Sequence, residues 1–319
     1  MSLDLTTEAL LQQMSETGGP ALHELPVEQA RAVLKELGDA TGITRTDIHS
    51  SLDQNIPGPN GEIPVRIYRP RARTEGELLP VLILYHGGGW ILGDIESHDA
   101  IARYLCRQGE VVVVSVDYRL APENKFPAGV VDCYAALEWV AENAAAIGID
   151  TRRIALTGDS AGGNLTIVMS MLARVRKGPD IAFQIPVYPC VDCRETADYS
   201  SRRKFGNGEY FLSSADIEWI YRNYLTAADD ADDFRASPIV ATELSGLPPA
   251  LLITAGYDPL CDEGALYARR LRESGVPVEY HCYTGTIHGF LSFAGVLDAG
   301  RDALDLIADR LRVNFGPRV

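Results

Sequence analysis

Short, continuous apolar runs alternate along most of the chain with longer segments whose apolar residues recur at helical spacing. A short continuous run is typical of a strand buried on both faces, and a spacing of three or four residues is typical of an amphipathic helix. This pattern predicts a mainly parallel sheet with helices on both faces, an α/β fold. The expected strands are 80–87, 110–118, 153–158, 181–189, 250–256 and 276–285, and the expected helices are 97–109, 129–148, 164–178, 263–274 and 296–315.

The first seventy residues show a different pattern of apolar and polar positions. Two polar segments, 5–14 and 27–40, carry apolar residues at helical spacing. Residues 51–61 contain four prolines or glycines close together and are expected to form a turn-rich connector, and 62–70 alternate like an exposed strand.

Residues 190–235 interrupt the alternation and are too long for an ordinary connection. They contain one clear helix, 213–225, with Ser213 or Ser214 as its expected N-cap. We interpret them as an insertion that folds over the sheet, with the N-terminal helices either joining it as a lid or covering a sheet edge. The expected organisation is N-terminal cap helices at 1–50, a catalytic domain at 51–189 and 236–319, and a cap insertion at 190–235.

Composition narrows the classes of partner. Of 319 residues, 46% are hydrophobic and 23% are charged, as in a globular protein. The net charge of −15 disfavours nucleic acid and anionic membranes as partners, because phosphate binding needs clustered cations. No apolar run approaches the 18 residues of a membrane span, and the N-terminus has no early Lys or Arg, unlike a secretory signal. We therefore expect a cytoplasmic protein with no membrane insertion.

The six cysteines are expected to be reduced thiols rather than a disulfide framework. Cys190 and Cys193 form a CxxC pair, but no second pair of Cys or His lies near them in the sequence. A tetrahedral zinc site needs four such ligands, so we expect no metal.

Residues 158–162 read Gly-Asp-Ser-Ala-Gly, directly after an expected strand and directly before an expected helix. A GxSxG motif in that context is a nucleophile elbow, in which the flanking glycines allow a sharp backbone reversal. Ser160 is then held at the carboxyl edge of the sheet, where ligands bind in open α/β folds. Asp159 is expected to help orient this turn.

Residues 86–90 read His-Gly-Gly-Gly-Trp and follow another expected strand. Three glycines let the backbone approach a ligand closely, and their amides can converge on one oxygen, as a tetrahedral oxyanion requires. A phosphate loop would need a following Lys or a GxGxxG pattern, and neither is present. His86 is expected to brace this loop rather than to act as a base.

A serine nucleophile needs a base and a group that orients the base. His288 follows an expected strand at the same edge as Ser160, with Gly289 beside it. His98 is expected to begin a surface helix, and His281 to be packed within a strand. Asp258 follows the strand 250–256 and is the expected acid, whereas the neighbouring Asp262 and Glu263 are interpreted as charges at a helix N-terminus.

The motifs HGGGW, DYRLAPE, GDSAGGN, DPLCDEG and HGF, in this order, resemble the hormone-sensitive-lipase-like bacterial esterases of the α/β-hydrolase fold, in the branch with the GDSAG motif. The resemblance covers nearly the whole chain. It implies hydrolysis of short- to medium-chain carboxylic esters without a cofactor, with Ser160 as nucleophile, His288 as base and Asp258 as its partner. It also implies oxyanion donors at Gly88, Gly89 and Ala161, supported by Gly87, and a helical cap.

Several points stay open at this stage. An amidase or peptidase on the same scaffold, or a receptor without catalytic activity, is an alternative function, although receptors related to this family tend to lose the triad histidine. Edge-to-edge dimers occur in the family, so a homodimer is a candidate assembly. The residues proposed to line a substrate pocket are Trp90, Tyr188, Phe205, Phe211, Leu212 and Phe290.

Overall fold

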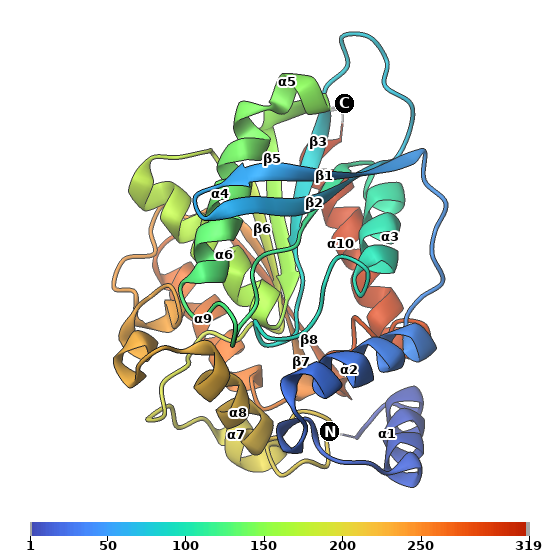
Figure 1. Ribbon diagram of the computed structural model, residues 1–319, viewed down its shortest axis with the longest axis vertical. Coiled ribbons are helices and arrows are strands. Elements are labelled where there is room, and N and C mark those ends of the chain that lie inside the picture. Colours follow the sequence, from blue (N-terminus) through green and yellow to red (C-terminus); the bar gives the residue numbers. More distant parts are fainter. Residues whose placement is uncertain (1, 317–319) are drawn as a thin grey trace.

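A sheet of eight strands in the order β1-β2-β4-β3-β5-β6-β7-β8 runs through the computed structural model, which describes residues 2–316 (Figure 1). β1 and β2 pair antiparallel with each other, β2 pairs antiparallel with β4, and the remaining neighbours are parallel. The strands are β1 Ser50–Gly58, β2 Gly61–Arg69, β3 Leu79–Tyr85, β4 Val112–Val116, β5 Ile149–Asp159, β6 Phe183–Val187, β7 Ala250–Tyr257 and β8 Val278–Ile287.

Helices cover both faces of this sheet. α3 and α10 pack together on one face, and α4, α6 and α9 lie on the other, with separate apolar clusters between each layer and the strands (Figure 1). The helices are α1 Leu5–Thr17, α2 Val27–Thr41, α3 Asp99–Gly109, α4 Ala128–Glu142, α5 Ala144–Ile147, α6 Ala161–Arg176, α7 Ser200–Phe205, α8 Ser214–Tyr224, α9 Cys261–Glu273 and α10 Asp298–Phe315. Short 3-10 turns lie at Leu22–Glu24, Ala228–Asp232 and Pro238–Val240.

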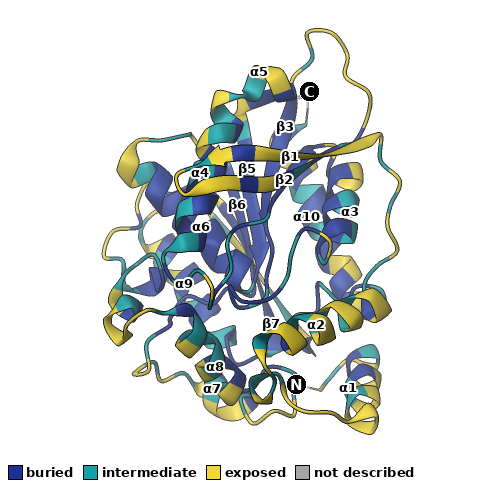
Figure 2. Cartoon of the chain, viewed as in Figure 1, coloured by how far each residue is buried: buried dark blue, intermediate teal, exposed yellow. Residues whose placement is uncertain are grey.

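The central strands are buried along their whole length, as Figure 2 shows. β3 and β4 consist mostly of Val, Ile and Leu because both of their faces are covered by helices. The expected α/β architecture with a mainly parallel sheet is therefore confirmed.

The expected connector at 51–61 is wrong. Most of it is the strand β1, paired with β2 from Ser50 opposite Arg69 to Gly58 opposite Gly61. β1 is the edge of the sheet, and Ile56 is its one buried residue. Since both faces of most of the strand are open to solvent, its sequence lacks the apolar alternation that identifies a strand.

Residues 190–235 contain two helices, α7 and α8, where the sequence predicted one. Ser213 is the N-cap of α8, and its Oγ accepts a hydrogen bond from the Asp216 amide at 3.0 Å. Asp216 also lies 2.7 Å from Nδ1 of His23, in the turn between α1 and α2. The N-terminal segment and the insertion thus contact each other at one end of the sheet (Figure 1).

Candidate active site

Ser160 lies between the end of β5 and the first residue of α6. Its backbone has φ 54° and ψ −114°, a region that residues other than glycine rarely occupy. The chain can reverse this sharply because Gly162 lies against the strand β3, where a Cβ would collide with the carbonyl oxygen of Tyr85. The turn therefore lifts the Ser160 side chain away from the sheet edge, in the geometry of a nucleophile elbow.

Ser160, His288 and Asp258 form a continuous chain of side-chain contacts. Ser160 Oγ lies 2.9 Å from His288 Nε2, and His288 Nδ1 lies 2.8 Å from Asp258 Oδ2. Asp258 follows β7 and His288 follows β8, so parallel strands deliver both to one edge. Asp258 is fully buried, and its Oδ1 accepts a hydrogen bond from the Leu260 amide at 2.8 Å, which fixes the carboxylate.

The glycine loop after β3 is attached to the elbow through Asp159. The Gly87 amide donates to Asp159 Oδ1 at 3.0 Å, and His98 Nε2 lies 2.9 Å from the same oxygen. Burial acts to raise the pKa of Asp159, but the neighbouring His98 holds it below its usual value. Asp159 thus stays ionised and positions the loop that contains Gly88 and Gly89 relative to Ser160.

The place of His98 at the start of an expected surface helix suggested an exposed side chain, but the side chain is buried. Its side chain is buried against Asp159, while its Nδ1 lies 3.0 Å from Ser97 Oγ. His281, expected to be packed, is exposed on β8. The sequence offered no signal for either position, because burial here depends on loops that meet only in the folded chain.

His86 is buried behind the loop, where its ring contacts Gly87 and Tyr118. Its Nδ1 lies 2.8 Å from the Gly87 carbonyl oxygen, and its ring stacks on Tyr118 with centroids 4.3 Å apart. Burial lowers the pKa of His86 to about 4, so the imidazole is neutral at physiological pH. These contacts are those of a residue that braces the loop.

The residues proposed as a substrate pocket lie in different surroundings. Tyr188 packs beside His288, with ring centroids 4.9 Å apart, and Phe290 lies behind Tyr188. Phe211 has a positive φ of 74° and packs against Phe293, close to Gly289.

The other three pack against different residues. Trp90 stacks on Tyr224, Phe205 packs against Tyr210 and Tyr257, and Leu212 belongs to the core. Thus, of the six proposed residues, Tyr188 lies beside His288 and Phe211 lies beside Gly289.

Ile220 is a site residue that the sequence did not reveal. A Cβ built on Gly89 would lie 2.9 Å from Ile220 Cδ1, so this α8 side chain covers the glycine loop directly. The helical spacing of α8 predicts an apolar face, but it cannot tell which element that face contacts.

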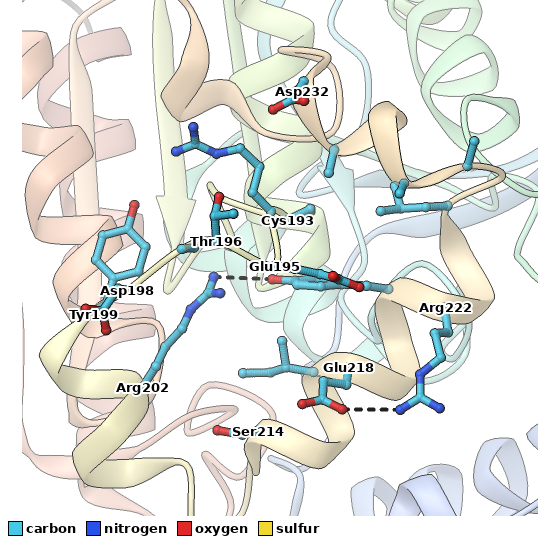
Figure 3. A pocket seen from close by; sticks show the side chains of 18 of the residues that line it. Cys193, Glu195, Thr196, Asp198, Tyr199, Arg202, Ser214, Glu218, Arg222 and Asp232 are labelled. Carbon is cyan, nitrogen blue, oxygen red and sulfur yellow. Dashed lines mark hydrogen bonds and ion pairs between the residues drawn. The ribbon is translucent and has the colours of Figure 1, made fainter.

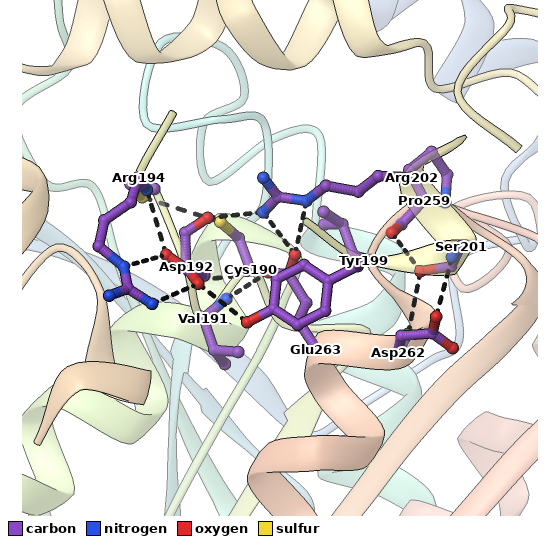
Figure 4. A network of polar contacts seen from close by, with 12 residues as sticks. Cys190, Val191, Asp192, Arg194, Tyr199, Ser201, Arg202, Pro259, Asp262 and Glu263 are labelled. Carbon is purple, nitrogen blue, oxygen red and sulfur yellow. Dashed lines mark hydrogen bonds and ion pairs between the residues drawn. The ribbon is translucent and has the colours of Figure 1, made fainter. Parts of the chain in front are cut away.

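Asp262 and Glu263, the alternative acids, bind residues of the insertion (Figure 4). Asp262 Oδ2 accepts from the Ser201 amide at 2.8 Å. Glu263 pairs with Arg202 at 2.9 Å. Burial raises the pKa of Glu263 to about 7, with Arg202 opposing this shift. The two residues anchor α7 to α9 and are more than the helix-terminal charges the sequence suggested.

A cavity of about 980 Å³ lies between α8, the segment 193–199 and the turn Ala228–Asp232 (Figure 3). Its wall carries paired charges such as Glu218 and Arg222, 3.2 Å apart. Neither the Ser160 contact chain nor any of the six proposed pocket residues lines it. This cavity is therefore separate from the candidate site.

Within residues 2–316, no three His, Cys, Asp or Glu side chains gather in an arrangement that could hold a metal ion. No helix in the same range combines the length and the apolar character needed to cross a bilayer. Cys190 and Cys193, the expected CxxC pair, are buried free thiols with their sulfur atoms 3.8 Å apart.

The sequence and the structure of this chain are similar to those of known proteins. A family model described as the alpha/beta hydrolase fold matches residues 82–292. The carboxylic ester hydrolase LipN of Mycobacterium tuberculosis is 47% identical over 75% of this chain, and the match spans 64% of LipN. The carboxylesterase NlhH of the same organism is 40% identical over 87% of this chain and 86% of its own length. A hyperthermophilic esterase from the archaeon Pyrobaculum calidifontis superposes with a TM-score of 0.90 at 41% identity, covering 98% of this chain and 99% of the esterase.

Proposed function

The chain belongs to the α/β-hydrolase fold family, and from this premise we propose that it is a carboxylic ester hydrolase that works through a covalent acyl-enzyme. The observation that carries the proposal is the contact chain from Asp258 through His288 to Ser160, beside a glycine loop. The esterase names of its relatives support the reaction class. The substrate is a small-molecule ester. Covalent labelling of Ser160 by an organophosphonate, located by peptide mass spectrometry, tests the proposal.

In the first half of the reaction, Ser160 Oγ attacks the ester carbonyl carbon. His288 Nε2 takes the hydroxyl proton, while Nδ1–H donates to Asp258 and keeps the ring in the required tautomer. The carbonyl oxygen becomes an oxyanion, which the amides of Gly88, Gly89 and Ala161 are proposed to bind. His288 then returns the proton to the departing alcohol, and the acyl-enzyme remains.

In the second half, a water molecule replaces the alcohol. His288 takes a proton from this water as it attacks the acyl carbon, and the same amides receive the second oxyanion. Collapse of this intermediate breaks the bond to Ser160 Oγ, which regains its proton from His288. The carboxylic acid leaves and the site returns to its starting state, with no cofactor consumed.

We also propose that residues 1–50 and 190–235 act together as the cap of this site. Two contacts support the assignment: His23 meets Asp216 across the two segments, and Ile220 of the insertion covers Gly89. A site that is covered by a cap can bury only a limited length of an acyl chain. Each buried methylene contributes about 0.8 kcal/mol while it fits, and further carbons gain nothing.

The acyl-chain profile is expected to peak at about four to eight carbons, a range taken from the family resemblance and the buried-length argument. kcat/KM measured on p-nitrophenyl esters from about two to sixteen carbons checks this. Ile220→Ala, which opens space beside Gly89, is expected to move the peak to longer chains, whereas Val175→Ala on the exposed face of α6 serves as the control. Activity that rises steadily through palmitoyl esters and increases at an emulsion interface would show a lipase instead.

EDTA is expected to leave kcat unchanged, because backbone amides stabilise the oxyanion in the proposed mechanism. The measurement is the initial rate on p-nitrophenyl butyrate before and after incubation with the chelator, with a zinc-dependent hydrolase as positive control. A loss of activity that added zinc restores would contradict the mechanism, and Cys190 and Cys193 would be the first ligands to test.

A further inference from the structure

Two of the six cysteines, Cys261 and Cys282, are partly exposed, while Cys106, Cys133, Cys190 and Cys193 are buried. Cys261 is the first residue of α9, and Cys282 lies in β8. The proposed esterase mechanism uses neither residue. They are therefore the thiols of the described chain that solvent reaches most readily.

The two cysteines meet because α9 packs on the end of the sheet. Cys282 lies opposite Thr254 of β7, and a Cβ built on Gly264 in the first turn of α9 would lie 2.8 Å from Thr254 Cγ2. Since side chains of paired residues share one face of a sheet, Thr254 and Cys282 both face α9. The first turn of the helix thus brings Cys261 to this pair.

The electrostatics of the two thiols agree with this placement. Cys261 and Cys282 each shift the pKa of the other thiol, and the Thr254 hydroxyl lowers the pKa of both. Tyr280, two residues before Cys282 on the same face of β8, hydrogen-bonds to Thr254 Oγ1 at 2.8 Å. Every side chain in the cluster can donate a hydrogen bond to a sulfur anion.

These donors make one of the thiols acidic. The hydrogen bond with Cys261 lowers the pKa of Cys282 to about 6 against the effect of burial, and Thr254 and Tyr280 act in the same direction. The Asp258 carboxylate is the charged group that opposes them. The thiolate is the nucleophilic form of cysteine, so the direction of this shift favours Cys282 as the attacking sulfur.

We propose that Cys261 and Cys282 form a reactive dithiol that is oxidised to an intramolecular disulfide by small-molecule disulfides. The Cys282 thiolate attacks one sulfur of the small disulfide, forms a mixed disulfide and releases one small thiolate, which takes up a proton. Cys261 then loses its proton, attacks the Cys282 sulfur and releases the second small thiol. Two protein thiols are oxidised and one small disulfide is reduced to two thiols.

This bond would join the two segments that carry the acid and the base of the candidate site. The Cys261 amide donates to the Asp258 carbonyl oxygen at 3.1 Å, and Cys282 precedes His288 by six residues in the same strand and its following loop. A disulfide across a closed loop of about twenty residues restricts the unfolded chain, so we expect the oxidised protein to melt roughly 5 °C higher.

The test uses the full-length protein treated with oxidised glutathione at neutral pH and quenched with iodoacetamide. We expect the intact mass to fall by two hydrogen atoms, and peptide mapping to show a bond between Cys261 and Cys282 that dithiothreitol reverses. Cys261→Ser should instead retain glutathione on Cys282. Cys282→Ser should lose the rapid reaction, and the buried control Cys106→Ser should behave like the parent protein.

A parent protein that keeps both thiols free until it unfolds would overturn the proposal. So would a bond between Cys190 and Cys193, or glutathione that stays attached to Cys282 although Cys261 is present. The readouts are mass and thiol connectivity, so they do not depend on the proposed esterase activity and separate the failure of one proposal from the failure of the other.

Discussion

Ser160→Ala is expected to lower kcat on a p-nitrophenyl ester by a factor of about 10⁴ to 10⁶ while leaving the fold intact. Without the hydroxyl no acyl-enzyme forms, and His288 has no proton to take from residue 160. The amides of the glycine loop would remain to bind the oxyanion, so a small residual rate above that in water should persist. Pre-steady-state kinetics would show this as the disappearance of the burst of p-nitrophenol.

Ser170→Ala is a matched control for this experiment. Ser170 is another buried serine of α6, and its hydroxyl donates to the Thr166 carbonyl oxygen one helical turn earlier. Removing that hydroxyl should cost little stability, because a hydrogen bond from a serine hydroxyl to the carbonyl oxygen four residues earlier contributes little to a helix. We expect kcat to stay within about twofold of the parent value. A Ser160→Ala protein that turns over at nearly the parent rate would mean that another residue is the nucleophile.

Asp258→Asn is expected to reduce kcat by about 10⁴-fold, mainly through the orientation and charge of His288. The carboxylate accepts from His288 Nδ1 and stabilises the imidazolium that forms when Ser160 attacks. An amide can present its NH₂ group to Nδ1 and thereby favour the wrong tautomer. Circular dichroism and the melting temperature should change little, because the Leu260 amide can still donate to the remaining oxygen.

Asp262→Asn separates this prediction from a general effect of removing charge near α9. Asp262 accepts from the Ser201 amide and thereby holds α7, so its substitution should alter KM or stability more than kcat. If Asp262→Asn or Glu263→Gln abolished turnover while Asp258→Asn did not, the assignment of the acid would be wrong.

The central sheet could be predicted from the sequence because burial on both faces leaves a local signature, the apolar runs of strands such as β3 and β4. β1 could not, since an exposed edge strand is defined by its pairing with β2 rather than by its own residues. The short helix α7 was missed for a related reason: Arg202 holds it in place through Glu263, which lies 61 residues away in the chain.

The residues of the candidate site likewise include some that the sequence could predict and some that it could not. Ser160, Asp258 and His288 each follow a predicted strand, and parallel strands bring their carboxyl ends to one edge, so their proximity could be inferred. The roles of His98 and Ile220 arise from contacts between a loop and the elbow and between α8 and the glycine loop. Such contacts depend on tertiary packing, for which neither periodicity nor motif spacing carries information.

The unusual backbone of Ser160 has a consequence for the evolution and engineering of this protein. A non-glycine residue held at φ 54° costs of order 1–3 kcal/mol, which the surrounding elbow must offset. The folded chain therefore gives up part of its own stability to keep the side chain of residue 160 aimed before any substrate arrives. Selection for stability alone would favour glycine at this position, and that change would remove the proposed nucleophile.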